Sequence, residues 1–251
     1  MESTDSQSIC PSSWRISQSK FRRDWIERWT SSEVAAYQAC AGELTEEQLD
    51  CHVQDLSQVY CFNRPIHILD VGSGAGTVCE ILCRWAVAAG GESDFRHACR
   101  ITALEPCPAM LELLRMRTAS LGIPVSAVCG FSDHLDDRTF FREATFDLVI
   151  SRQVANGLYD PVAAFENWRY WLRPGGTVIL MDGTFDRAGW SNVSDVDLFP
   201  LAATKSLSTI PYLLARSGFD VQSVGWMSRT NQHPTTRTPR YVVVARKNSD
   251  K

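Results

Sequence analysis

The sequence predicts an α/β fold: a doubly wound, mostly parallel sheet of seven strands with a terminal antiparallel hairpin. Short apolar segments alternate with helical segments from residue 62 onward, which is typical of parallel strands joined by crossover helices. A glycine-rich turn directly follows the first apolar segment. The last two apolar segments are joined by a polar loop in which no helix is expected, so they pair most simply as a hairpin.

The N-terminal part of the chain has a different pattern. Residues 1–13 are polar and serine-rich, and we expect them to form a disordered tail. Aromatic residues recur at helical spacing from Phe21, and residues 45–48 have the sequence of a helix capping box. We therefore expect residues 14–61 to form a helical lid that folds over the open ends of the strands.

Residues 62–251 are expected to form the α/β domain. The predicted strands are 66–71, 100–105, 124–129, 146–151, 177–182, 219–226 and 240–246. The predicted helices are 75–89, 107–120, 161–172 and 206–217. The tripeptide at 174–176, Pro-Gly-Gly, is expected to be the turn that leads into the fifth strand.

Composition excludes several classes of protein. The 251 residues carry a formal net charge of −4 and no dense basic stripe, so nucleic acid is not expected as a partner. The chain has no apolar run of membrane-spanning length and begins without a signal-peptide pattern, so we expect a cytoplasmic protein with no membrane association. The nine cysteines include no C-x-x-C pair, and neither a disulfide framework nor a metal site is expected. Composition leaves the oligomeric state open.

The strongest chemical signal is the segment ILDVGSGAG at 68–76, between the first strand and the first helix of the domain. In open α/β sheets ligands bind at the carboxyl ends of strands, where this turn lies. Its glycines let the backbone approach a ligand closely, and amide groups at a helix start can meet a carboxylate. Asp70 can accept hydrogen bonds from an ammonium group. The methionine part of S-adenosylmethionine (SAM) carries both groups.

Glu105 supplies the second signal, because a carboxylate at the end of the second strand can accept two ribose hydroxyls. A nicotinamide dinucleotide is the alternative ligand, and its fingerprint is G-x-G-x-x-G. Here the third glycine comes one residue early and Thr77 stands in its place. An acidic residue also precedes the first glycine by two positions. Both features favour SAM.

With these motifs the chain resembles a class I SAM-dependent methyltransferase of the UbiE-like group, also called methyltransferase type 11. The likeness covers about residues 62–185 and extends more loosely to residue 247. The segments that carry it are ILDVGSGAG, ITALEPCPAML, the run from FDLVISRQ to LRPGGTVILMDG, and RYVVVARK. The resemblance implies a SAM cofactor and a Rossmann-like methyltransferase fold.

The resemblance also implies roles for individual residues. Those expected around the methionine part of SAM are Asp70, Gly72, Ser73, Gly74 and Gly76. Glu105 should hold the ribose, with Pro106 and Met110 near the adenine. Ser151, Arg152 and Gln153 should border the methyl group. Many relatives have Gly-Asp-Ala after the third strand, whereas this chain has Gly130-Phe131-Ser132-Asp133, where Phe131 could stack on the adenine and Asp133 could accept from its amine.

The acceptor side gives weaker signals. Candidate catalytic residues are His134, Gln153 and Tyr159, although the ordinary interpretation of each is a surface or packing residue, and Gln153 stands where relatives often have histidine. Candidate substrate-binding residues are Trp25, Tyr37, Gln153, Trp190 and Phe199. Packing against the sheet is the alternative for the N-terminal aromatic residues. The histidines at 52, 67 and 97 are expected to be structural.

The sequence therefore predicts an enzyme that methylates oxygen, nitrogen or carbon of a small molecule or a modified peptide by in-line displacement. Transfer needs alignment of acceptor, methyl group and sulfur, and no metal. Two alternatives remain: a catalytically silent SAM-fold protein that supports a partner, and, less favoured, an NAD-dependent oxidoreductase. The intact turn and Glu105 argue against the first, and the glycine spacing argues against the second.

Overall fold

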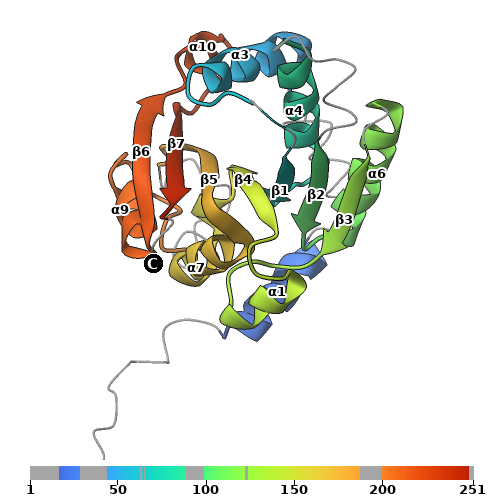
Figure 1. Cartoon of the computed structure of the whole chain (residues 1–251), viewed down its shortest axis with the longest axis vertical. Coiled ribbons are helices and arrows are strands. Elements are labelled where there is room, and N and C mark those ends of the chain that lie inside the picture. Colours follow the sequence, from blue (N-terminus) through green and yellow to red (C-terminus); the bar gives the residue numbers. More distant parts are fainter. Residues whose placement is uncertain are drawn as a thin grey trace, which may run out of the picture.

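A seven-stranded sheet forms the centre of the protein in a computed structural model that describes residues 17–28, 44–62, 64, 66–88, 99–121, 124–186 and 199–248 (Figure 1). Its strand order is β3-β2-β1-β4-β5-β7-β6. The strands are β1 (His67–Val71), β2 (Arg100–Glu105), β3 (Val125–Cys129), β4 (Phe146–Arg152), β5 (Leu172–Gly183), β6 (Phe219–Trp226) and β7 (Arg240–Lys247). Strands β1 to β5 are parallel, and β7 runs antiparallel to both β5 and β6. The predicted fold class is confirmed.

Helices cover both faces of this sheet. They are α1 (Gln18–Arg28), α3 (Glu46–Ser57), α4 (Thr77–Ala88), α6 (Pro108–Leu121), α7 (Pro161–Trp171), α9 (Thr209–Arg216) and α10 (Ser228–Gln232). Two short 3-10 turns, η2 (Leu135–Phe140) and η3 (Ala155–Gly157), flank β4. Figure 1 shows α3, α4 and α10 on one side of the sheet and α7 on the other.

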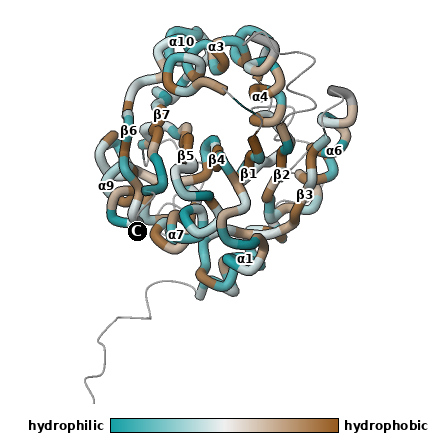
Figure 2. The backbone as a smooth tube through the Cα atoms, in the orientation of Figure 1, coloured by the Kyte–Doolittle hydropathy of each residue, from teal (hydrophilic) through white to brown (hydrophobic). Residues whose placement is uncertain are grey.

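Two apolar clusters, one on each face, hold these layers together. The first joins α7 and α9 to the sheet around Trp168 and Trp171, both fully buried. The second joins α3 and α4 to the opposite face around Leu56, Ile81 and Trp85. In Figure 2 the hydrophobic residues gather on the central strands, whereas the outward sides of the helices are more hydrophilic. Complete burial of a large apolar side chain stabilises the fold by about 1.5–3 kcal/mol.

The capping box at the start of α3 forms as expected. The Thr45 amide donates to Gln48 Oε1 over 2.8 Å, and the Gln48 amide donates back to Thr45 Oγ1 over 3.3 Å. The helix it begins is tied to the C-terminal hairpin by Asp55, whose carboxylate accepts from the amides of Arg229 (3.0 Å) and Thr230 (2.9 Å) at the start of α10. Segments 175 residues apart are thereby joined.

Two expected details of the domain are wrong. The loop between β6 and β7 contains the short helix α10, which the polar sequence SRTNQ concealed and which Asp55 of α3 stabilises from outside. The segment Pro174–Gly176 is also not a turn before the strand, because β5 begins at Leu172 and carries this segment as an irregularity. The register shifts there: Phe146 pairs with Leu172 and Leu148 pairs with Thr177. Gly175 accommodates the distortion with φ of 72°.

The sheet register places the functional end of the domain. Val71 lies opposite Leu104 on one side and Ser151 on the other, so β1, β2 and β4 end at the same edge. The glycine-rich turn follows β1, Glu105 is the last residue of β2, and Gln153 follows β4. Parallel strands of an open sheet bind ligands at this edge.

Candidate active site

The glycine-rich turn after β1 is held against β2 and leaves one backbone position open. The amides of Gly72 and Ser73 both donate to the Leu104 carbonyl, over 2.8 and 3.2 Å. Gly72 has φ of 64°, and a β-carbon there would lie 2.3 Å from a methyl group of Val154. Gly74 has φ of 52°, and a β-carbon there would meet no atom within 4 Å. The turn thus needs glycine at 72 for space, whereas its backbone at 74 faces an opening.

Glu105 closes the second side of this turn. Its Oε2 accepts from the Gly74 amide and its Oε1 accepts from the Cys107 amide, both over 3.0 Å. The side chain is nearly buried, and burial raises the pKa of Glu105 to about 7, although the two amide donors oppose that shift. Glu105 is therefore a carboxyl group at the mouth of the turn that can exchange its backbone donors for the hydroxyls of a ligand.

Asp70 lies behind the turn, on the α4 side. The residue is fully buried; Cys79 Sγ–H donates to its Oδ2 over 3.7 Å, and Oδ1 has no hydrogen-bond partner among the described residues. Burial, with the nearby Glu105 carboxylate adding to it, raises the pKa of Asp70 to about 8. A buried carboxyl group with an unsatisfied oxygen is costly in isolation and favours a cationic partner.

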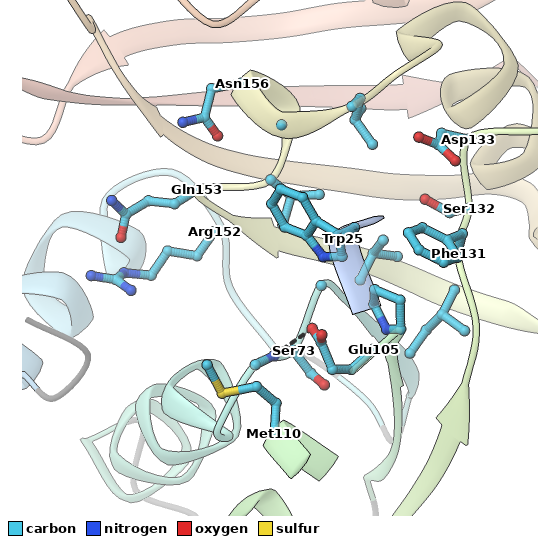
Figure 3. A pocket seen from close by; sticks show the side chains of 18 of the residues that line it. Trp25, Ser73, Glu105, Met110, Phe131, Ser132, Asp133, Arg152, Gln153 and Asn156 are labelled. Carbon is cyan, nitrogen blue, oxygen red and sulfur yellow. Dashed lines mark hydrogen bonds between the residues drawn. The ribbon is translucent and has the colours of Figure 1, made fainter. Parts of the chain in front are cut away.

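These elements enclose one cavity of about 460 Å³, within the usual size range of small-molecule sites (Figure 3). Of the residues predicted from sequence, those that line it are Trp25, Gly72, Ser73, Gly74, Glu105, Pro106, Met110, Phe131, Ser132, Asp133, Arg152 and Gln153. Those that lie outside its lining are Asp70, Gly76, Ser151, His134, Tyr159 and Phe199. Tyr37 and Trp190 lie outside the described residues. The structure thus brings most of the candidate cofactor residues together in one lining and leaves His134 and Tyr159 outside it.

One wall of the cavity comes from the loop after β3. Phe131, Ser132 and Asp133 lie there, opposite Arg152 and Gln153 in Figure 3. Asp133 is buried; its Oδ2 accepts from the Tyr159 amide over 2.9 Å and its Oδ1 from Arg22 over 2.8 Å. The Arg22 guanidinium also lies 4.6 Å from the centre of the Phe131 ring. The first helix and the loop after β4 are thus both joined to this wall.

The opposite wall is formed by the end of β4. Arg152 Nε donates to His52 Nε2 over 3.5 Å, and His52 Nδ1 is 2.7 Å from the Gln48 carbonyl. Burial and the Arg152 charge lower the pKa of His52 to about 3, so its ring is neutral and accepts from the arginine. His52 is structural, as expected, but the expectation missed that it holds a residue of the cavity wall.

Helix α1 contributes an aromatic edge. Phe21 and Trp25 line the cavity, and the Phe21 ring lies 5.4 Å from the Tyr159 ring and 5.3 Å from the Phe199 ring. Tyr159 and Phe199 therefore support the lining aromatics from behind. The same aromatic cluster therefore packs on the domain and also lines the cavity, and contact with a substrate stays a prediction.

His134 takes a structural position. It is the N-cap residue of η2, where its Nδ1 accepts from the Asp136 amide over 3.2 Å, and its side chain is 44% exposed. Asn156, Val154, Leu158 and Phe185 line the cavity although the sequence did not single them out. These residues follow the carboxyl ends of β4 and β5, and this position in the sequence could have identified them as candidates. No group of His, Cys, Asp and Glu side chains suited to a metal ion occurs in the part of the chain that the structure describes.

Comparisons with known proteins agree with this fold. Residues 69–180 match a family model described as a methyltransferase domain. No curated protein matches the sequence. A SAM-dependent methyltransferase from Aquifex aeolicus has 14% identity and a TM-score of 0.60, and the match covers 87% of this chain and 98% of that one. A phosphoethanolamine N-methyltransferase from Haemonchus contortus has 17% identity and a TM-score of 0.62, and the match covers 90% of this chain and 60% of that one. A [4+2]-cyclase has 16% identity and a TM-score of 0.59, covering 79% and 80%.

Residues 69–180, which contain the glycine turn and Glu105, match the methyltransferase-domain family, and the fold is that of class I SAM-dependent methyltransferases. At these identities the solved structures show the fold alone. SAM is the cofactor of the class, and the residues present fit it. The unsatisfied oxygen of Asp70 suits a cation, and the backbone at Gly74 leaves room for close approach. Among the described residues no helix is long and apolar enough to cross a membrane.

Proposed function

We propose that this protein transfers the methyl group of SAM to an oxygen, nitrogen or carbon atom of a small-molecule acceptor. The observation that carries the proposal is a single cavity in which the glycine turn, Glu105 and the end of β4 meet an aromatic edge from α1. The cofactor side and the acceptor side are thus parts of one enclosed space. Such an arrangement suits an in-line displacement between two bound molecules.

The cofactor half of the cavity has groups for each part of SAM. The ammonium group is assigned to Asp70, which is buried behind the turn and outside the cavity lining, so the turn has to move before the ligand reaches its Oδ1. The Ser73–Gly74 backbone can approach the carboxylate. Glu105 can accept from the ribose hydroxyls, with Pro106, Met110 and Phe131 around the adenine. When bound, SAM supplies an activated methyl group on a positive sulfur. The protein's part is to hold the acceptor in line with it.

Alignment is the main contribution that these residues can make to the rate. Holding two reactants in a reactive geometry lowers the activation barrier by up to about 7–11 kcal/mol. The lining residues after β4, from Gln153 to Leu158, stand where the acceptor would meet the methyl group. The described residues of the lining include no histidine, tyrosine or lysine, so an acceptor that is already nucleophilic near pH 7 suits the cavity best. The lid expected from residues 14–61 belongs to the same proposal, since its described helix α1 carries the aromatic edge.

Calorimetric titration of the protein with SAM, S-adenosylhomocysteine and NAD tests the cofactor assignment. Binding of the first two without NAD is expected. Release of S-adenosylhomocysteine is then measured across a panel of phenols, thiols, amines and carboxylates. Binding of NAD alone would refute the class of ligand. Tight SAM binding with no turnover on any acceptor would contradict the proposed enzyme and favour the catalytically silent alternative. Turnover that leaves the methyl group on SAM would refute the proposed methyl transfer.

A further inference from the structure

The backbone at Gln153 has a conformation that side-chain-bearing residues rarely adopt. Its φ is 56°, in the left-handed region, and among the described residues only Ala144, with φ of 53°, is a second non-glycine case. The Gln153 amide donates to the Met181 carbonyl of β5 over 2.8 Å, which fixes the turn at this point. Such strain persists only where the surrounding structure enforces it, and it is common at functional sites.

The turn that follows Gln153 is fixed as well. Asp182 is fully buried, and its Oδ2 accepts from the Asn156 amide in η3 over 3.3 Å, while its Oδ1 accepts from the Gly183 amide over 2.7 Å. Gln153 and Asn156 both line the cavity, and Figure 3 shows both side chains above the level of Glu105. Two primary amides are therefore presented from one rigid segment at the carboxyl end of β4.

The charged groups of the lining are already engaged in other contacts. Glu105 accepts from the Gly74 amide, Asp133 from Arg22, and Arg152 donates to His52. The remaining lining near η3 is aromatic or aliphatic and includes Phe21, Trp25, Leu158 and Phe185. This part of the cavity combines apolar surface with uncharged groups that can both donate and accept hydrogen bonds.

We propose that Gln153 and Asn156 are specificity-determining residues that select an uncharged, flat acceptor with a hydrogen-bonding group beside the methylated atom. The left-handed backbone at Gln153 places this long polar side chain in the cavity lining. A glycine would adopt that backbone more easily, so the presence of a long polar side chain there indicates a use for it. This inference rests on the proposed methyl transfer.

Removing the Gln153 side chain separates the effect of backbone strain on stability from the effect of the carboxamide on acceptor recognition. Gln153→Gly relieves the backbone strain and is expected to raise the melting temperature. It should also lower kcat/KM for an uncharged aromatic acceptor at least tenfold, mainly through KM, with SAM affinity unchanged within twofold. Ala144→Gly is the matched control, because it relieves the same strain outside the cavity lining and should raise the melting temperature with no change in turnover. A Gln153→Gly variant with full acceptor turnover would overturn the proposal.

Matched acceptors test the chemical class. The probes are 2-aminonaphthalene, whose amine is neutral and nucleophilic at pH 7, the same compound with a ring carboxylate, and the same compound with a ring aminomethyl group. Each is measured for turnover with SAM and for binding to the protein saturated with S-adenosylhomocysteine. The neutral ring should be preferred at least tenfold, and Gln153→Glu should shift the preference toward the aminomethyl probe. Equal or better use of a charged probe, or binding of none of the three, would overturn this inference. Failure to bind SAM would instead refute the proposed function, so the two failures are distinguishable.

Discussion

Asparagine in place of Asp70 is expected to make the protein more stable and less able to bind its cofactor. Asp70 is fully buried, and burial raises its pKa to about 8, whereas an aspartate in an unfolded chain has a pKa of about 3.9. At pH 7 the carboxyl group is therefore neutral in the folded protein, whereas its ionisation lowers the free energy of the unfolded chain. Asparagine has nearly the same shape as the neutral acid and cannot ionise.

The size of the effect follows from these pKa values. Each unit of difference between the folded and unfolded pKa corresponds to about 1.4 kcal/mol. At pH 7 the free energy of unfolding of the wild-type protein is therefore lowered by on the order of 3–4 kcal/mol, which Asp70→Asn would restore. For a chain of this length that is a rise in melting temperature of roughly 6–15 °C. The difference should be near zero at about pH 4, grow as the pH rises toward about 8, and remain constant above it.

Cofactor binding should change in the opposite direction. Loss of the carboxylate removes a charged hydrogen bond to the ammonium group, which is worth about 1.5–3 kcal/mol, or roughly 10–100-fold in the dissociation constant. Urea unfolding at pH 5, 7 and 8 and calorimetry with SAM measure the two effects.

The matched control is Asp147→Asn, outside the cavity. The His67 amide and the Arg64 and Arg173 guanidinium groups lower the pKa of Asp147, so this variant should lose stability and keep its SAM affinity. An Asp70→Asn protein that is less stable than wild type at pH 8, or that binds SAM equally well, would refute the reasoning.

Three further outcomes are expected. Glu105→Gln should weaken SAM binding about tenfold by calorimetry, because the ribose hydroxyls lose a carboxylate acceptor and the glutamine NH2 group faces one of the two backbone amides that donate to Glu105. Arg22→Met leaves two buried carboxylates unpaired and should cost roughly 3 kcal/mol in urea unfolding, whereas Lys20→Met, in an exposed ion pair, should cost less than about 1 kcal/mol. The pKa of His52 is lowered to about 3, so its contribution to the free energy of unfolding is complete above about pH 6.5 and is lost as the pH falls toward 3. His52→Gln should remove this part of the pH dependence of stability. A variant with unchanged acid sensitivity in urea unfolding would contradict the argument.

Local sequence patterns predicted most of the fold. Alternation of strands and helices, the capping box at Thr45 and the glycine turn each follow from short-range physics, and each appears as expected. Helix α10 was missed because its stability comes from Asp55, which lies far away in the sequence. A side chain that caps a helix from another element leaves no signal in that helix.

The proposed cofactor half of the site was more predictable than the proposed acceptor half. Glu105 ends a strand, so its place at the sheet edge could be inferred from alternation alone. His134 has the residue type of a base, but its ring caps η2, and no pattern in the sequence distinguishes these two uses. Arg22 was missed because its importance depends on Asp133 and Asp137, more than 100 residues away.

The position of β7 has a consequence for how the chain is made. This strand comes after β6 in the sequence but lies between β5 and β6 in the sheet. Until it emerges from the ribosome, one edge of β5 has no partner and β6 has nothing to pair with. Exposed strand edges promote association with other chains. A nascent chain that stalls before residue 240 should therefore depend on chaperones, and truncations in this region should yield insoluble protein rather than a smaller folded domain.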